Sequence, residues 1–181
     1  CLALAMQERG TLAKGKVVGT VMTNCGLETR LGKAGIDLHR VAVGDRYILE
    51  KMRQDGLNLG GAPSGHMLMT DFARSGDGLL TALQMLTLLK TSGKKASTLF
   101  NSFLPNPQRL ENLRGIDPAI LQGKKLQSDL ANIEANLNGK GRVLVRPSGT
   151  EALVRVMVEA ETDALLTEAM DALILRIKAG S

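Results

Sequence analysis

Aromatic side chains are scarce in this sequence of 181 residues, which contains no tryptophan, one tyrosine and three phenylalanines. Its hydrophobic core must therefore consist mainly of leucine, valine, isoleucine, methionine and alanine. Binding of sugars or nucleic-acid bases by aromatic stacking is correspondingly disfavoured. The length is enough for one large domain or two small ones, each with a modest core.

Cysteine and histidine are also scarce. The two cysteines, Cys1 and Cys25, lack the CxxC spacing of zinc and redox motifs, and the histidines, His39 and His66, lie far apart in the sequence. These counts disfavour a disulfide framework and a zinc motif. We therefore expect a reducing, cytoplasmic setting and no metal ion bound by this chain.

Long runs of one residue class are missing. The formal net charge is +5, but the densest basic clusters are the pairs Lys94-Lys95 and Lys124-Lys125. The basic residues are thus interpreted as a solvated surface, and no nucleic-acid partner is expected. The apolar stretch at 2–6 is too short to cross a membrane and no basic leader precedes it, so no membrane association is expected. Because the sequence starts without Met inside a predicted helix, we expect it to be truncated at that end.

Strand and helix patterns alternate over the first 104 residues. Runs rich in β-branched or other apolar residues predict strands at 16–22, 36–43, 57–61 and 66–70. Helices are predicted at 1–9, 24–34, 45–54, 76–90 and 97–103. This alternation predicts a three-layer α/β/α domain with a mostly parallel sheet. The leucine-rich helix at 76–90 is apolar around most of its circumference and is expected to be buried.

Two prolines in the segment 104–107 (LPNP) disfavour both helix and central strand, so we expect domains at 1–104 and 105–181. The second part predicts a helix at 119–137, strands at 142–145 and 152–160, and a last helix capped by Thr162. This order favours a smaller α+β domain with a mostly antiparallel sheet. In the strand at 152–160, Arg155 and Glu159 are predicted on the face opposite to the valines.

The turn between these two strands has the composition of an anion site. Gly149 allows the backbone amides to converge, Ser148 and Thr150 add hydroxyl donors, and the planar guanidinium of Arg146 matches phosphate oxygens. Such a turn can form an anion-binding nest. A plain hairpin whose arginine faces water explains the same turn residues equally well.

The stretch RPSGTE, followed by LVRVMVEAE, resembles the phosphate-binding loop in the C-terminal domain of the α-D-phosphohexomutase superfamily. The resemblance implies that Arg155, on the outgoing strand, faces the same pocket, although it could pair with Glu151 or Glu159 instead. The family usually has proline where this chain has Ala152. Four residues would hold the phosphate group: Arg146, Ser148, Gly149 and Thr150.

Residues 60–66 (GGAPSGH) resemble the sugar-binding loop G-E-x-S-G-H of the same superfamily. This implies that Ser64 and Gly65 bind the sugar and that His66 acts as a general acid–base; a structural histidine bonded to the backbone is the alternative. Ala62 replaces the family's glutamate. Because hydrogen bonds to charged groups are worth roughly 1.5–3 kcal/mol each, we expect weakened sugar recognition. His39 is interpreted as structural.

Two further segments are similar to the phosphoglucosamine branch of the superfamily, VGDRYILE at 43–50 and SGDGLLTAL at 75–83. The first implies that Asp45 and Arg46 lie near the substrate and help to set the choice of sugar. Without the resemblance, Asp45 is explained as a helix N-cap, and the glycines at 76 and 78 as a tight entry to a helix.

As a whole, the resemblance implies the last two domains of an enzyme that interconverts glucosamine 6-phosphate and glucosamine 1-phosphate through a bisphosphorylated sugar. Its partners would be a phosphorylated hexosamine and the missing N-terminal domains of the same polypeptide. A phosphoglucomutase, a phosphomannomutase and a non-catalytic phosphosugar-binding module are alternatives. The family's phosphoserine and its magnesium loop (DGDxDR) are not found in this sequence. We therefore expect magnesium to be bound outside this chain and the chain alone to be inactive.

Overall fold

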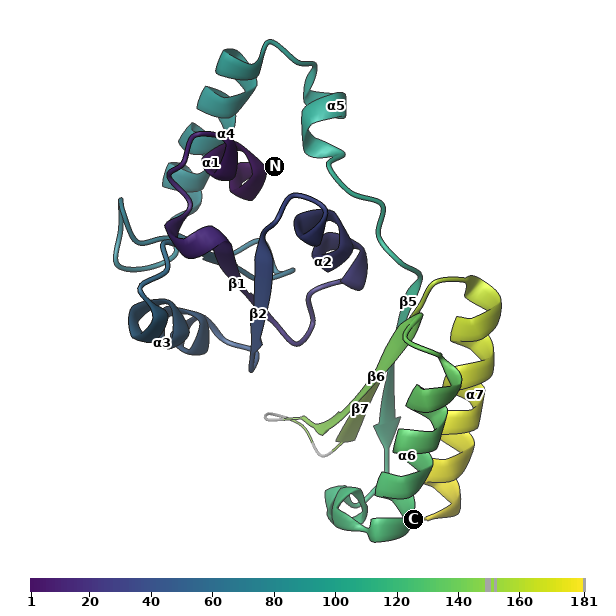
Figure 1. Cartoon of the computed structure of the whole chain (residues 1–181). Coiled ribbons are helices and arrows are strands. Elements are labelled where there is room, and N and C mark those ends of the chain that lie inside the picture. The colour runs from purple at the N-terminus through teal and green to yellow at the C-terminus, as the bar shows by residue number, and fades with distance from the viewer. Residues whose placement is uncertain (149–150, 152, 181) are drawn as a thin grey trace. The chain divides into compact units, whose positions relative to one another are not determined.

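Two sheets, one mostly parallel and one antiparallel, organise the chain in the computed structural model, which describes residues 1–148, 151 and 153–180 (Figure 1). The contacts divide the chain into unit 1, Cys1–Pro105, and unit 2, Asn106–Ser181. The predicted sequence of an α/β part followed by a smaller part with an antiparallel sheet is confirmed.

The sheet of unit 1 has the strand order β2-β1-β3-β4. Its central strand β1 (Lys16–Thr20) pairs in parallel with β2 (Asp37–Val41) and with β3 (Leu59–Gly61). The short strand β4 (Met67–Met69) runs antiparallel to β3. The parallel pairs require crossover connections, which the intervening helices supply.

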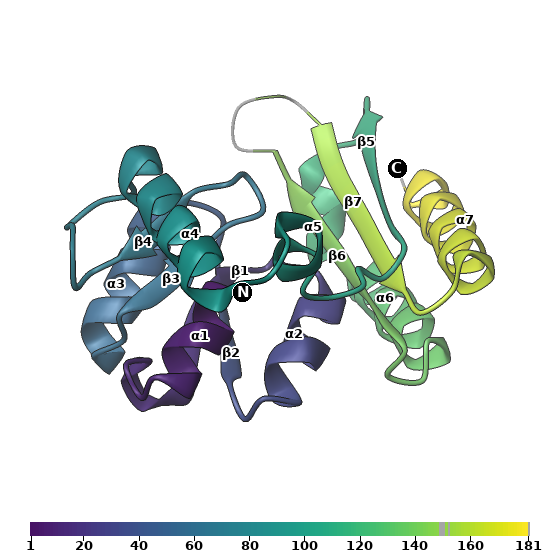
Figure 2. The same cartoon turned by 90° about the horizontal axis from the view of Figure 1, so that it is seen from above.

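Helices cover both faces of this sheet (Figures 1 and 2). Val17 and Val18 follow each other on β1 and point to opposite faces. Val17 belongs to the cluster formed with α1, α2 and α4, whereas Val18 belongs to the cluster formed with α3. The predicted three layers are therefore present. The helical segments are α1 (Leu2–Glu8), the 3-10 turn η1 (Ala13–Gly15), α2 (Cys25–Gly32), α3 (Asp45–Asp55), α4 (Gly78–Ser92) and α5 (Ala96–Phe100).

The close approach of α3 to the sheet depends on Gly60. A Cβ atom at Gly60 would lie 2.5 Å from Cγ2 of Ile48 and 2.8 Å from Sδ of Met52. Both of these side chains are fully buried. Since the interior is close-packed and has no room for the added atom, any larger residue at this position would push α3 outward.

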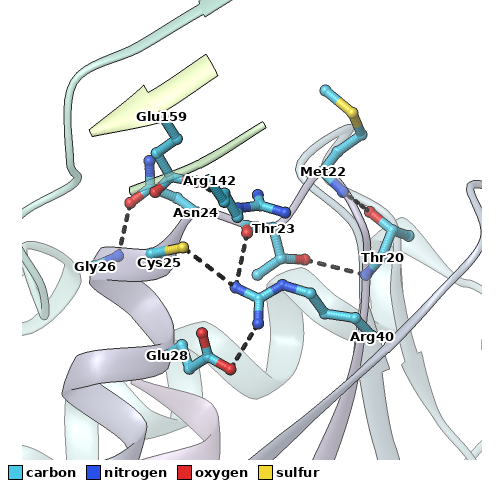
Figure 3. Close-up of polar contacts among 10 residues, drawn as sticks. All are labelled: Thr20, Met22, Thr23, Asn24, Cys25, Gly26, Glu28, Arg40, Arg142 and Glu159. Carbon is cyan, nitrogen blue, oxygen red and sulfur yellow. Dashed lines mark hydrogen bonds and ion pairs between the residues drawn. The ribbon is translucent and has the colours of Figure 1, made fainter. Parts of the chain in front are cut away.

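A polar network ties the loop after β1 to β2 and α2 (Figure 3). Arg40 on β2 forms an ion pair with Glu28 on α2 at 2.6 Å and donates a hydrogen bond to the carbonyl of Thr23 at 3.2 Å. The hydroxyl of Thr23 in turn accepts from the backbone N–H of Thr20 at 3.0 Å. Asn24 caps α2 as predicted, with its side chain accepting from the N–H of Gly26. These contacts connect the loop at the carboxyl end of β1 to β2 and to the start of α2.

The prediction that the leucine-rich helix is buried was wrong. Leu88 is 6% exposed and packs in the core, but Leu79, Leu83 and Leu86 are 73%, 54% and 60% exposed. These three leucines follow the i, i+4, i+7 spacing and form a stripe on the face of α4 that points away from Leu88. The helix therefore has one buried side and one apolar, exposed side.

Unit 2 contains the sheet β5-β7-β6, in which all neighbours are antiparallel. The helices α6 and α7 pack on one face through Val154, Val156 and Val158. The predicted alternation along the long strand is thus confirmed, with Arg155 and Glu159 on the other face. The elements are β5 (Gln108–Arg114), the 3-10 turn η2 (Pro118–Gln122), α6 (Lys124–Asn136), β6 (Gly141–Pro147), β7 (Leu153–Ala160) and α7 (Asp163–Ala179).

Two features of unit 2 differ from the sequence-based expectation. The helix predicted at 119–137 is interrupted at Gly123, which is extended and separates η2 from α6. The strand β5 was not predicted.

The predicted cap of the last helix is confirmed, because the hydroxyl of Thr162 accepts from the N–H of Leu165 at 3.3 Å. Among the described residues, none of the helices combines the length and the apolarity needed to span a membrane.

The two sides of α4 predict unequal costs for the same substitution. Leu88→Ala should lower the free energy of unfolding by about 2–5 kcal/mol, because it leaves a cavity in the core. Leu83→Ala, on the exposed side of the same helix, should change it by less than about 0.5 kcal/mol. Urea denaturation followed by circular dichroism measures both variants. Equal destabilisation by the two substitutions would contradict this orientation of α4.

Candidate functional site

Two arginines face each other at the turn end of the sheet in unit 2. Arg146 on β6 and Arg155 on β7 are directly opposite in the antiparallel register, so their side chains leave the same face of the sheet. Asn112 on β5 continues this row, opposite Arg155. The row lies on the face that α6 and α7 do not cover. Like charges directly opposite each other are destabilising unless an anion lies between them.

A third guanidinium and one carboxylate complete this cluster. Glu151 contacts Arg114, at the end of β5, with 3.1 Å between Oε2 and Nη2. The other oxygen of Glu151 lies 3.5 Å from Nη2 of Arg155. Of the two predicted partners of Arg155, the structure thus selects Glu151, while Glu159 pairs with Arg142 at 2.9 Å. Arg114 and Arg155 therefore share one acidic partner, whereas no ion pair of the Arg146 guanidinium is found in the described structure.

The hydroxyl of Ser148 lies at the start of the same turn. The backbone N–H of Ser148 donates to the carbonyl of Leu153 at 2.9 Å, which fixes the residue beside the last pair of the ladder. Within the described part of the chain, the buried Oγ of Ser148 and the buried Nε of Arg155 have no hydrogen-bond partner. Buried donors normally have an acceptor, so these two atoms are suited to a bound anion.

The other predicted residues of this turn, Gly149 and Thr150, lie outside the described residues, as does Ala152. Over the described ranges, the side chain of Arg146 makes no hydrogen bond or ion pair, although its backbone belongs to the ladder with β7, so its guanidinium is available to a ligand. Guanidinium groups and the hydroxyl of Ser148 are donors of the kind that bind a doubly charged oxyanion such as a phosphate monoester.

Three segments that the sequence singled out meet in unit 1. Nδ1 of His66 lies 2.9 Å from Oδ2 of Asp45, across 21 positions of sequence. Gly76 lies beside them, since a Cβ atom at this glycine would be 3.6 Å from the same carboxylate oxygen. The interpretation of Asp45 as a helix N-cap was wrong, because Gly44 occupies that position and no side chain caps α3.

A tight turn presents the residues before His66. The N–H of Gly65 donates to the carbonyl of Ala62, and the N–H of Ala62 donates to the carbonyl of His66, both at 3.0 Å. Gly65 has φ of +91°, a backbone conformation that residues with a Cβ atom rarely adopt. Ser64 at the tip is exposed, and its hydroxyl makes no hydrogen bond within the described chain. It can therefore bind a polar ligand.

The guanidinium of Arg46 contacts the neighbouring residue of its own helix, Tyr47. It lies 4.4 Å from the centre of the Tyr47 ring and donates a hydrogen bond to the Tyr47 hydroxyl. This cation–π contact leaves Arg46 exposed at the start of α3, close in sequence to Asp45. Its predicted contact with a substrate remains a prediction.

The second histidine lies in a different environment. Nδ1 of His39 is 3.9 Å from Oδ2 of Asp55, which also contacts Lys51 at 3.0 Å. The hydrogen bond from Lys51 holds the pKa of Asp55 below its ordinary value of 3.8. This charged cluster at the end of α3 agrees with a structural role for His39.

Over the described residues, no group of three or more His, Cys, Asp and Glu side chains is arranged to hold a metal ion.

Arg114 is the member of the anion cluster that the sequence analysis missed. It lies on β5, and it approaches the turn only because β5 pairs with β7 over seven residues, with Arg114 opposite Leu153. Nothing near Arg114 in the sequence resembles an anion-binding motif. Arg114 could have been found only by predicting that residues 108–114 form a strand paired with β7.

Comparison with protein families identifies two matching regions. Residues 1–106 match the family described as phosphoglucomutase/phosphomannomutase, alpha/beta/alpha domain III. Residues 99–176 match the C-terminal domain of the same family. Together the two matches cover nearly the whole chain.

Similar proteins are considerably longer than this chain. The phosphoglucosamine mutase of Paracoccus denitrificans is 48% identical over 180 residues, which are 98% of this chain and 40% of that protein. The phosphoglucosamine mutase of Novosphingobium aromaticivorans is 50% identical over 168 residues, 91% of this chain and 38% of the relative. The chain thus spans about 40% of the length of the relatives that it matches.

Solved structures show the same fold. The N-acetylphosphoglucosamine mutase of Aspergillus fumigatus superposes with a TM-score of 0.84 at 18% identity, over 98% of this chain and 42% of that chain. A structure of the Aspergillus enzyme in complex with GlcNAc-6P and magnesium gives a TM-score of 0.78 at 17% identity, over 94% of this chain and 44% of the other.

The arginine cluster predicts binding of inorganic phosphate. Arg146→Ala and Ser148→Ala should each weaken it, the first by about 10- to 150-fold, because a hydrogen bond to a charged group is lost. Arg109→Ala is the matched control, because this substitution also removes one positive charge from the sheet. Arg109 lies on β5 and pairs with Glu111 at 2.7 Å, not with a residue of the arginine cluster. Isothermal titration calorimetry measures the affinities. Unchanged binding by Arg146→Ala would refute the site.

Proposed function

The chain belongs to the phosphoglucomutase/phosphomannomutase family, and from this membership we propose that it supplies sugar and phosphate binding to an enzyme that interconverts glucosamine 6-phosphate and glucosamine 1-phosphate. The reaction would transfer a phosphoryl group by way of a bisphosphorylated sugar. Residues 1–104 would be the third domain of that enzyme and residues 105–181 the fourth. Its cellular location would be the cytoplasm.

One observation carries the proposal: two buried donors, Oγ of Ser148 and Nε of Arg155, have no partner in the described structure and lie at a cluster of guanidinium groups. Leaving a buried donor unsatisfied costs about 1–3 kcal/mol, so a ligand that supplies acceptors would recover that cost. A phosphate dianion matches both the charge and the number of acceptors. Arg146 would hold this phosphate together with Ser148 and the backbone of Gly149 and Thr150.

Unit 1 would recognise the sugar. Ser64 and the backbone of Gly65 would bind hydroxyl groups, and Asp45 and Arg46 would contribute to the choice of sugar. His66 would transfer a proton to or from a sugar hydroxyl, because an imidazole can serve as a general acid or base. These roles rest on the similarity of residues 43–50 and 60–66 to the family's segments.

The phosphoryl-transfer step would depend on residues outside this chain. Phosphoryl transfer requires a positioned phosphate donor and a metal ion that neutralises charge. From the resemblance to the family, we propose that the metal and the phosphoserine lie in the further domains that the longer relatives have, and these domains would be the partners of this chain.

The identity of Ala62 favours a second candidate, a phosphosugar-binding module without catalytic function. Ala62 has no carboxylate to accept hydrogen bonds from sugar hydroxyls, although its backbone closes the turn that carries Ser64. Loss of such an acceptor weakens binding of a sugar more than binding of phosphate. A phosphoglucomutase or phosphomannomutase would use the same phosphate site with another sugar.

The proposal predicts no mutase activity for the 181-residue chain alone. Conversion of glucosamine 6-phosphate to the 1-phosphate, followed by phosphorus NMR, should remain at the uncatalysed rate even with magnesium and the bisphosphorylated sugar. Fusion to the N-terminal domains of the Paracoccus denitrificans relative should produce activity that His66→Ala lowers by about 10²- to 10⁴-fold. Turnover by the chain alone would contradict the proposal that phosphoryl transfer needs the N-terminal domains. A fused enzyme that folds and remains inactive would contradict the proposal that this chain supplies sugar and phosphate binding.

Restoring the missing carboxylate predicts a gain of affinity. Ala62→Glu should strengthen binding of glucosamine 6-phosphate by about tenfold or more, because a charged acceptor for hydroxyl groups is added. Binding of inorganic phosphate should stay the same. Ala62→Gln is the matched control, with the same size and no charge. Equal affinities for glucosamine 6-phosphate and inorganic phosphate in the Ala62→Glu variant would mean that this turn does not contact the sugar.

A further inference from the structure

The contact between Asp45 and His66 has a geometry that determines where the imidazole proton lies. Only Nδ1 of His66 faces the carboxylate, at 2.9 Å from Oδ2. An ionised carboxylate accepts hydrogen bonds and donates none. Neutral His66 must therefore carry its proton on Nδ1 to make this bond, and Nε2 is left with a free lone pair. Neutral histidine in water prefers the opposite tautomer.

The surrounding backbone holds both partners in place. The carbonyl of His66 closes the tight turn with the N–H of Ala62 at 3.0 Å, so the ring starts from a fixed point. Asp45 is the first residue of α3, where the helix dipole favours a negative charge. Gly44 supplies the N-cap with φ of +134°, which leaves the Asp45 side chain free to face the imidazole.

Neighbouring charged groups are engaged elsewhere. Asp77 caps α4, because its Oδ1 accepts from the N–H of Leu80 at 2.9 Å. Arg46 lies over Tyr47 rather than beside the carboxylate of Asp45. Asp45 is thus the acidic group that contacts His66 in the described structure. The imidazole is 62% exposed, so a ligand can reach Nε2.

We propose that Asp45 is a positioning residue for His66: it holds the proton on Nδ1 and thereby presents Nε2 as the base that accepts a proton from a sugar hydroxyl. This inference rests on the proposed function for the identity of the proton donor. It changes the role of Asp45 from a direct sugar ligand to a group that acts through the histidine. A carboxylate that orients an imidazole in this way is a recurring arrangement in acid–base catalysis.

The tautomer can be observed directly in the protein as it is. The chain has two histidines, so long-range proton–nitrogen NMR spectra of labelled protein, at a pH where both are neutral, contain two imidazole patterns. We expect the Nδ1–H form for His66 in the wild type. In Asp45→Ala it should change to the Nε2–H form, while His39 stays the same. Glu50→Ala, an exposed acidic residue of the same helix, is the control and should leave His66 in the Nδ1–H form.

Two results would overturn the inference: a wild-type His66 in the Nε2–H form, or a tautomer that Asp45→Ala leaves unchanged. If Asp45→Ala disturbs α3, the isosteric Asp45→Asn gives a second reading, since its neutral amide is a weaker acceptor and should reduce the Nδ1–H population. Phosphate calorimetry on the same samples reports on the proposed function separately. Failure of wild-type phosphate binding together with the expected tautomer change would refute that function and leave the role of Asp45 intact.

Discussion

The opposition of Arg146 and Arg155 across two strands is the constraint on which the functional end of unit 2 depends. Their register places two guanidinium groups on one face at one level of the sheet, an arrangement that repels unless a negative charge joins it. Glu151 contributes one such charge to Arg114 and Arg155. The remaining positive charge and the buried hydroxyl of Ser148 support the proposal that an anion binds here.

Unit 1 carries the turn at 62–66, to which we assign sugar binding as part of the proposed function. Two hydrogen bonds close this turn, and Gly65 takes a positive φ that permits the close return of the chain. Gly60 allows α3 to pack tightly on the sheet. The position of Asp45, the first residue of α3, is therefore set by packing in the core.

Sequence patterns predicted the elements whose signal is local. The alternation of Val154, Arg155 and Val156 identified β7 and its two faces, and the caps at Asn24 and Thr162 located two helix starts. β5 had no such signal, because its leucines are three residues apart and its other side chains are polar. The exposure of Leu79 on α4 was equally hidden, since an apolar helix gives no indication of which side meets the core.

The candidate site divides in the same way. Motifs that are contiguous in sequence, such as RPSGTE and the turn with Ser64, could be found without coordinates. Contacts between distant segments could not: Arg114 reaches Glu151 only through strand pairing, and Asp45 reaches His66 across 21 positions. The residue type of Asp45 before a helix suggested a cap, the commonest reason for aspartate at that place. Because Gly44 takes the cap position, the carboxylate of Asp45 does not cap α3 and lies against the imidazole of His66 instead.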